Sequence, residues 1–146
     1  MNFAEINELW KSRCRGEPES AIEIYILGVL LYEINENEGE AACSLALHKN
    51  LTIIDEKKHS IEIRLNQKEK QNLEILKRKP YIIRSYIKDP NNPKLFLRKK
   101  EVARSRAKIL IKSNLKSPPT SILLIKDEAG YWKIVEGTYS LIEGIE

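Results

Sequence analysis

The feature that most constrains the fold of this chain is the stretch 21–34, which is apolar on nearly every side if it is wound as a helix. A helix of this kind is normally buried at the centre of a domain. Its strongly apolar part contains Glu23 and is far shorter than the roughly 20 residues that a membrane crossing needs. We therefore expect a buried central helix, no membrane partner, and other elements packed around that helix.

Three further helices are predicted in the first half of the chain. Phe3, Ile6, Leu9 and Trp10 lie at helical spacing and form one apolar stripe, and a short helix is expected at 39–47. Another helix begins after Asn66, because Glu69 follows at the spacing of a capping box, and it ends before Pro80. Two short strands, 51–54 and 61–63, are expected around a polar turn at 55–60.

After Pro80 the apolar period changes towards two, which is typical of strands. Strands are predicted at 81–88, 95–97 and 105–112, and a hairpin at 121–126 and 131–140. In the strand 105–112, Ala107, Ile109 and Ile111 share one face, opposite Lys108 and Lys112. Helices followed by antiparallel strands predict an α+β fold, in which N-terminal helices pack on a curved antiparallel sheet. A length of 146 residues favours a single domain, 1–146.

Several motifs resemble a family of uncharacterised bacterial domains. The segment Lys-Pro-Tyr-Ile-Ile-Arg-Ser-Tyr at 79–86 is similar to that family's Lys-Pro-Tyr-Ile-x-Arg-Ser-Tyr segment. The strand at 107–113, the Ser-Pro-Pro at 117–119 and the Gly-Tyr-Trp-Lys at 130–133 resemble its later motifs in order and spacing. The family is grouped with domains of unknown function, so the resemblance implies no activity. The order of elements is also similar to nuclear-transport-factor-2-like and cystatin-like folds.

The charge of the chain is distributed unevenly. Residues 1–62 hold 6 Lys/Arg against 12 Asp/Glu, whereas residues 63–116 hold 17 against 4. The segment 98–108 is the most basic, with six cations and one glutamate. The asymmetry indicates a surface for an anionic partner, an internal match between acidic helices and basic strands, or a charged surface that is merely solvated. For the first case, the predicted contact residues are Arg98, Lys100, Arg104, Arg106 and Lys108.

A second candidate site is a small-anion pocket lined by Arg84, Tyr86 and Trp132. An arginine among aromatic and aliphatic neighbours on a sheet can bind a carboxylate or phosphate with two parallel hydrogen bonds. The alternatives are that Arg84 forms a structural ion pair or stacks on Tyr86, and that Trp132 is a core residue.

The sequence contains no recognisable catalytic constellation. His48, His59, Cys14 and Cys43 are not paired at the short spacings of metal sites, and neither histidine accompanies a nucleophile motif. The glycines are scattered and form no phosphate-binding loop. We therefore predict no catalytic residue, no cofactor and no metal. Two reduced cysteines and an N-terminus unlike a signal peptide favour a cytoplasmic protein.

The favoured function is a non-enzymatic binding or protein-interaction module, with an acidic protein partner for the basic segment 98–108 or a second copy of the chain on the open face of the sheet. The first alternative is a small-anion pocket protein or enzyme that uses Arg84. The second is nucleic-acid binding through the basic segment 98–108.

Overall fold

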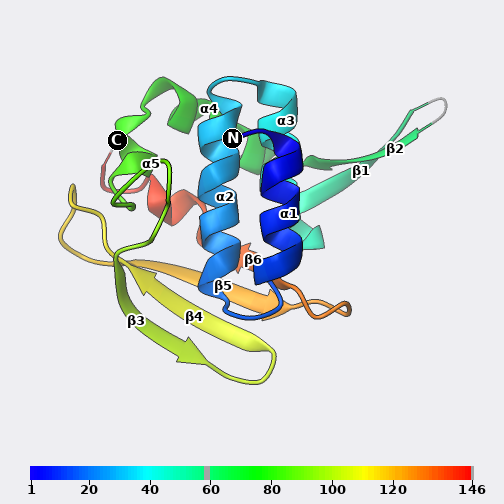
Figure 1. Ribbon diagram of the computed structural model, residues 1–146. Helices are drawn as coiled ribbons and strands as arrows, with labels where there is room; N and C mark the ends of the chain where they lie inside the picture. Colours follow the sequence, from blue (N-terminus) through cyan, green and yellow to red (C-terminus); the bar gives the residue numbers. More distant parts are fainter. Residues whose placement is uncertain (58–59, 146) are drawn as a thin grey trace.

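The structure is a computed structural model and describes residues 1–57 and 60–145. Its helices are α1 (Phe3–Arg13), α2 (Glu19–Tyr32), α3 (Glu36–Ala46), α4 (Gln67–Arg78) and α5 (Tyr81–Arg84). Its strands are β1 (Thr52–Lys57), β2 (Ser60–Leu65), β3 (Leu97–Val102), β4 (Arg106–Ile111), β5 (Thr120–Lys126) and β6 (Trp132–Glu136), and the 3₁₀ turns are η1 (Lys49–Leu51) and η2 (Tyr139–Leu141) (Figure 1). The predicted α+β class is confirmed.

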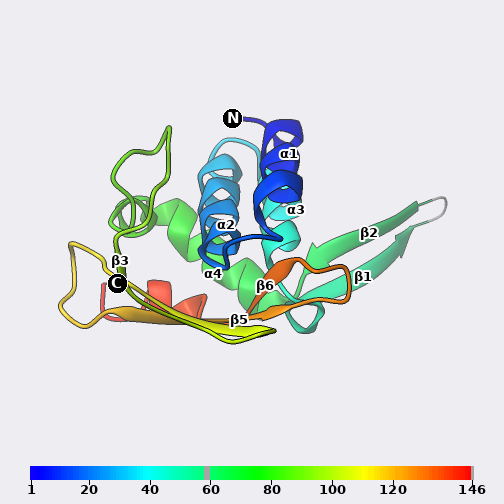
Figure 2. The same ribbon diagram turned by 60° about the horizontal axis from the view of Figure 1, so that its bottom comes forward.

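The strands form two sheets. One has the order β3-β4-β5-β6 with every neighbouring pair antiparallel, and the other is the β1–β2 hairpin alone. Figure 2 shows the larger sheet nearly edge-on, with α1 and α2 on one side of it and the β1–β2 hairpin extending away from the body. The His48 amide donates to the carbonyl of Ile134 at 2.8 Å, so the chain at 47–48 runs along β6. Among the described residues, β3 is therefore the open edge of this sheet.

The predicted central helix is α2, and most of its residues are buried, including Ile22, Ile24 and Tyr25. It packs closely against α3 because Gly28 has no side chain. A Cβ atom at Gly28 would lie 2.8 Å from the amide nitrogen of Cys43 and 2.6 Å from its Sγ. The two helices thus approach each other at a distance that only glycine permits.

Three helices begin with an asparagine cap, the arrangement predicted at Asn66. The side chains of Asn2, Asn35 and Asn66 each accept from the amide three residues later. Because Asn35 caps its helix, α3 begins at Glu36 rather than at the predicted residue 39. The predicted capping box at Asn66 is only half formed. Its acidic member, Glu69, instead accepts a hydrogen bond from Thr138 Oγ1 at 2.7 Å.

The predicted strand at 81–88 is wrong, because this segment begins with the helix α5. Pro80 precedes it with φ −63° and ψ −20°, a helical conformation that the proline ring favours. The buried residues Ile82, Ile83 and Tyr86 follow helical spacing, whereas Tyr81 and Arg84 are exposed. Two adjacent isoleucines on the same face are incompatible with the alternation of a strand.

Several other strand boundaries differ from the prediction. The predicted turn at 55–60 is shorter in the structure, because β1 continues to Lys57 and β2 begins at Ser60. The strand expected at 95–97 is β3, which begins at Leu97 and contains much of the basic segment. The strand expected to reach residue 140 ends at Glu136, because Gly137 adopts φ +116°. A Cβ atom there would lie 2.6 Å from the Ser121 carbonyl oxygen. Lys58 and His59, in the predicted turn 55–60, lie outside the described residues.

Candidate functional site

The face of the large sheet that points away from the helices is partly apolar and partly basic. On β4, Ala107, Ile109 and Ile111 are buried, as predicted, while the alternate side chains point the other way. Residues directly opposite each other in the register share a face of the sheet. The pairs Arg106–Ile125, Lys108–Leu123 and Leu110–Ser121 therefore lie together. We define the open face as these side chains and Lys112, which continues the alternation: Arg106, Lys108, Leu110, Lys112, Ser121, Leu123 and Ile125.

The open face carries a column of cations beside apolar side chains. Arg106 and Lys108 of β4 and Lys112, directly after β4, are exposed on the same face of the sheet. Leu123 and Ile125 of the neighbouring strand β5 are half-buried. Within the residues that the structure describes, none of the three cations lies within ion-pair distance of a carboxylate.

The register of the sheet also places two carboxylates beside these side chains. Glu101 of β3 lies opposite Lys108, and Glu136 of β6 lies opposite Leu123. A hydrogen bond from Lys99 and the charge of Lys108 lower the pKa of Glu101. The surface thus offers an excess of positive charge beside apolar area.

The other predicted contact residues of the basic segment 98–108 lie outside the open face. Lys100 lies opposite Ile109, on the side of the helices, and its ammonium bonds Glu17 and, at 2.9 Å, Glu19. The hydrogen bond from Lys100 lowers the pKa of Glu17. Arg98 sits at a register shift of β3 and Arg104 in the β3–β4 turn, both exposed. Of the five predicted contact residues, Lys100 thus ties β3 to the start of α2, and the other four form no ion pair in the described structure.

Other ion pairs join the acidic first part of the chain to its basic middle. The two terminal guanidinium nitrogens of Arg84 donate to the two carboxylate oxygens of Glu33, each at 2.9 Å. Lys77 bonds Glu36, while Arg64 and Lys70 each lie 3.6 Å from the buried carboxylate of Glu40. The internal charge match that the sequence left open therefore accounts for part of the asymmetry.

The structure does not bring Arg84, Tyr86 and Trp132 together. Arg84 is held by Glu33 on the surface, the Tyr86 hydroxyl is buried and donates to the Leu141 carbonyl at 2.6 Å, and Trp132 Nε1 donates to the Gly16 carbonyl at 3.1 Å. In the described part of the chain, no hydrogen bond or ring contact joins any two of the three. The geometry gives no support to a ligand pocket built from these residues.

The motif residues meet instead in a buried polar network. Ser113 Oγ donates to Ser85 Oγ at 2.6 Å, and the Asn114 amide donates to the Ser85 carbonyl at 3.2 Å. Tyr86, one residue later, bonds Thr120 Oγ1 at 3.0 Å in addition to Leu141. The segments 79–86, 107–113 and 140–141 are thus connected through side chains that water does not reach, which is a structural role.

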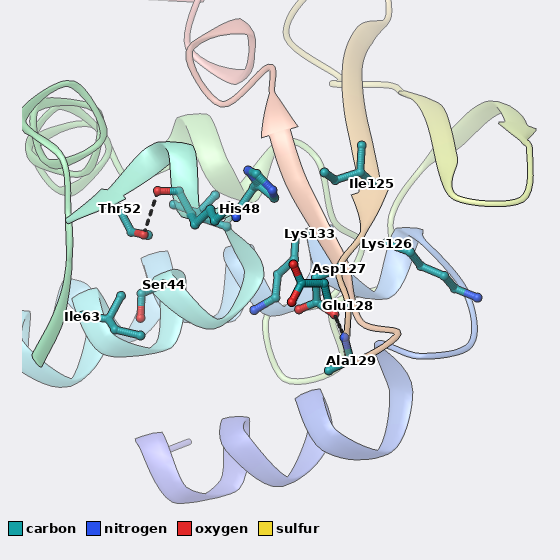
Figure 3. Close-up of a pocket in the computed structure, with 12 residues that line it drawn as sticks. Ser44, His48, Thr52, Ile63, Ile125, Lys126, Asp127, Glu128, Ala129 and Lys133 are labelled. Atoms are coloured by element: carbon teal, nitrogen blue, oxygen red, sulfur yellow. Dashed lines mark hydrogen bonds between the residues drawn. The ribbon is translucent and has the colours of Figure 1, made fainter. Parts of the chain in front are cut away.

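A pocket of about 500 Å³, which we call the edge pocket, lies where the sheet meets the β1–β2 hairpin (Figure 3). Ile125 belongs to both the open face and this pocket, so the two surfaces are continuous. The lining comes from the end of α3, the chain leading into β1, the β2 strand and the β5–β6 hairpin: Ser44, Leu47, His48, Lys49, Thr52, Ile63, Ile125, Lys126, Asp127, Glu128, Ala129 and Lys133.

Most polar groups of the edge pocket already have partners inside the protein. Lys133 Nζ donates to the Leu45 carbonyl at 2.7 Å and lies 4.9 Å from the centre of the Trp10 ring. Burial lowers the pKa of this lysine. Asp127 Oδ1 accepts from the Ala129 and Tyr131 amides at 3.0 and 2.9 Å. Figure 3 shows Lys133 and Asp127 side by side, with Lys126 pointing away from them.

The edge pocket could not be predicted from the sequence. Its lining comes from segments that are far apart in the chain, and the one motif that touches it, Gly-Tyr-Trp-Lys at 130–133, contributes only Lys133. Only the packing of the β1–β2 hairpin beside the β5–β6 hairpin creates this pocket, so no local pattern could have indicated it.

The described residues form neither a cluster of metal ligands nor a reactive thiol site. There, no group of three or more His, Cys, Asp and Glu side chains is placed to hold a metal ion. Burial raises the pKa of Cys14 to about 12, and Cys43 is buried as well, so neither thiol is available as a nucleophile. His48 Nδ1 bonds Asn50, and His59 lies outside the described residues. In residues 1–57 and 60–145, no helix combines the length and apolar character that a membrane crossing requires.

Comparison with known proteins gives one match. A family model described as a domain of unknown function (DUF6935) matches residues 1–146. The chain belongs to this family. The expectation of an uncharacterised family is confirmed, and the DUF6935 description names no activity. No curated protein and no solved structure matches this DUF6935 domain. A nuclear-transport-factor-2-like or cystatin-like shape therefore stays a prediction.

Proposed function

We propose that this domain is a protein-interaction module that binds an acidic segment of a partner protein on the open face of its sheet. The main support is that Arg106, Lys108 and Lys112 form no ion pair in the described structure. These three cations lie beside the half-buried side chains of Leu123 and Ile125. Positive charge next to half-buried apolar area suits a segment with both carboxylates and apolar side chains.

A second copy of the chain suits this surface less well. A two-fold dimer brings the same patch of both copies together. Two columns of Arg106, Lys108 and Lys112 would then face each other, and like charges placed opposite each other at an interface cost several kcal/mol.

Nucleic acid is also less well matched to the open face. Proteins that bind single strands on a sheet usually stack bases on aromatic side chains. The open face presents leucine, isoleucine and serine instead, and the basic segment 98–108 contains no aromatic residue.

Two further expectations stay predictions of the same proposal. A single domain is supported by the core, which contains buried residues from Ile6 in α1 to Ile142 near the C-terminus. A cytoplasmic location is supported by the two free cysteines, Cys14 and Cys43.

The test is binding of a labelled 12-residue peptide of alternating Glu and Ala, followed by fluorescence anisotropy at several salt concentrations. We expect R106A/K108A to weaken binding about tenfold and R106E/K108E to abolish it, because each removes charge from the contact. K11A/K68A is the matched control, since Lys11 and Lys68 are exposed on helices and their loss changes the net charge by the same amount. This control should bind like the unchanged protein.

Three results would overturn the proposal. The first is an affinity that does not respond to Arg106 and Lys108, or responds equally to K11A/K68A. The second is tighter binding of a 12-nucleotide single-stranded DNA with the same dependence on Arg106 and Lys108, which would assign the open face to nucleic acid. Light scattering of the same samples identifies a dimer that R106E/K108E disrupts, in which case a second copy occupies the face.

A further inference from the structure

We propose that the edge pocket holds one large apolar side chain, such as phenylalanine, of the same acidic segment that lies on the open face. This inference rests on the proposed function, because it specifies how the partner of that surface is anchored. A bound segment would then be held by ion pairs along β4 and by one buried side chain at the end of the sheet.

The edge pocket is continuous with the open face. Ile125 lies opposite Arg106 on one neighbouring strand and opposite Lys133 on the other. Arg106 belongs to the open face, and Lys133 lines the edge pocket. Arg106 and Lys133 are two strand spacings apart, about 10 Å, so a segment bound along β4 can place the side chain that lies beside Arg106 in the edge pocket.

Several polar groups that line the edge pocket already have partners within the protein. The ammonium of Lys133, the carboxylate of Asp127 and the hydroxyl groups of Ser44 and Thr52 all bond partners within the protein. Leu47, Ile63, Ile125 and Ala129 remain as apolar lining. A pocket of about 500 Å³ lies within the range of roughly 300–1,000 Å³ that ligand pockets occupy. Because these polar groups are already bonded, the apolar lining is the part of the pocket that can contact a bound group, and it suits an apolar one.

Ile63 is an exposed apolar residue in the wall of the edge pocket. Its side chain lines the pocket from β2, and the residue is 58% exposed. A bound apolar side chain would remove this surface from water, which is favourable in proportion to the area covered. Well-packed anchors of this kind carry most of the energy of many interfaces.

The charge around the pocket fits an acidic partner. The cations Lys49, Lys126 and Lys133 outnumber the carboxylates of Asp127 and Glu128. Asp127 Oδ1 accepts from two backbone amides and Lys133 Nζ donates to the Leu45 carbonyl, so one carboxylate and one cation are bonded internally and an excess of one positive charge remains. The occupant is therefore a segment whose carboxylates flank the apolar anchor, rather than an uncharged apolar chain.

The experiment compares the alternating Glu/Ala peptide with a series in which one alanine is replaced by phenylalanine at successive positions. At the matching position, we expect binding about tenfold tighter, the gain that burial of a large apolar side chain provides. Ile63→Ser and Ala129→Trp should both remove this gain, the first by opening the pocket wall and the second by filling the pocket from an exposed turn. The gain from phenylalanine is measured for each variant relative to the affinity of the same variant for the plain peptide.

Ile54→Ser is the matched control. Ile54 pairs with Ile63 across the hairpin and is 70% exposed, but it does not line the edge pocket. This variant should keep the full gain from phenylalanine.

The failures of the two proposals are distinguishable. If the plain peptide binds through Arg106 and Lys108 but phenylalanine adds nothing at any position, only the anchor is overturned. A gain that survives both Ile63→Ser and Ala129→Trp overturns it as well. If the plain peptide does not bind, or ignores Arg106 and Lys108, the acidic partner is overturned, and an Ile63-dependent gain would then leave an apolar site without that partner.

Discussion

At the scale of single residues, buried polar side chains connect distant parts of the chain. Tyr86 joins α5 to the C-terminal segment through the Leu141 carbonyl, and Glu69 joins α4 to Thr138. Glu69 is 5% exposed, and its Oε1 atom is buried without a hydrogen-bond partner. Burial raises the pKa of Glu69 because the charged carboxylate is poorly solvated there.

This environment predicts that Glu69→Gln stabilises the protein at neutral pH. A raised pKa means that the folded state holds the proton more tightly than the unfolded chain does. The stability that this group contributes is complete below about pH 4.3, the ordinary value for glutamate, and is lost as the pH rises through the raised value. Glutamine keeps an acceptor for Thr138 and cannot ionise. Urea unfolding at pH 4 and pH 7 should show the gain at pH 7 only.

Glu8→Gln is the control for this measurement, because Glu8 lies on the exposed surface of α1. Its pH profile should follow that of the unchanged protein. A lower stability of Glu69→Gln at pH 7 would mean that the carboxylate charge itself is needed, for example at the positive end of α4.

At the scale of elements, the contact between α2 and α3 sets the shape of the helical layer. Gly28 meets the backbone of Cys43, and Gly39 meets the backbone of Tyr32. A Cβ atom at Gly39 would lie 2.3 Å from the Tyr32 Cα atom. Both helices contribute a glycine, so neither can turn or shift without losing the close contact.

We predict that Gly28→Ala destabilises the fold by about 1–3 kcal/mol, the usual cost of overpacking a core. The added methyl group would push against backbone atoms of Cys43, which cannot move aside as a flexible side chain can. Gly16→Ala is the matched control, because the nearest atom to a Cβ there is 3.5 Å away and its φ is not positive. Thermal unfolding of both variants provides the comparison, and equal midpoints would contradict the close contact.

At the scale of the whole molecule, the uneven charge of the sequence divides into two parts. One part is neutralised internally, through Lys100 with Glu17, Lys77 with Glu36 and Arg84 with Glu33. The other part, on β4 and the β3–β4 turn, forms no ion pair within the described residues. This second part is the charge that remains for a partner.

The internal pairs predict a loss of stability in acid. Lys100 lowers the pKa of Glu17, and Lys77 lowers the pKa of Glu36, through hydrogen bonds to the charged carboxylates. The stability from a lowered pKa is present above about pH 4.3 and is lost as the pH falls through the lowered value. In E17Q/E36Q these pairs are already missing, so the variant should lose less stability than the unchanged protein between pH 5 and pH 2. Urea unfolding followed by tryptophan fluorescence measures this, and parallel curves would contradict it.

Much of the fold could be predicted because local sequence carries the relevant physical signal. The apolar surround of residues 21–34 predicted the buried helix α2, and the alternation in β4 predicted which side chains face the core. The asparagine before α4 predicted where that helix begins. Segment 81–88 was predicted wrongly because a short apolar run after proline suits a helical turn as well as a strand, and packing decided between them.

Period and composition over neighbouring residues are enough to predict the α+β class, the central helix and the basic character of 98–108. Which cations remain available depends instead on how the folded chain packs. Lys100 and Glu17 are 83 residues apart in the chain, and only the packing of β3 beside the start of α2 makes them partners. The edge pocket arises for the same reason, because Ile63 and Ile125 come from different sheets. Contacts between distant segments depend on how complete elements pack, which no local pattern encodes.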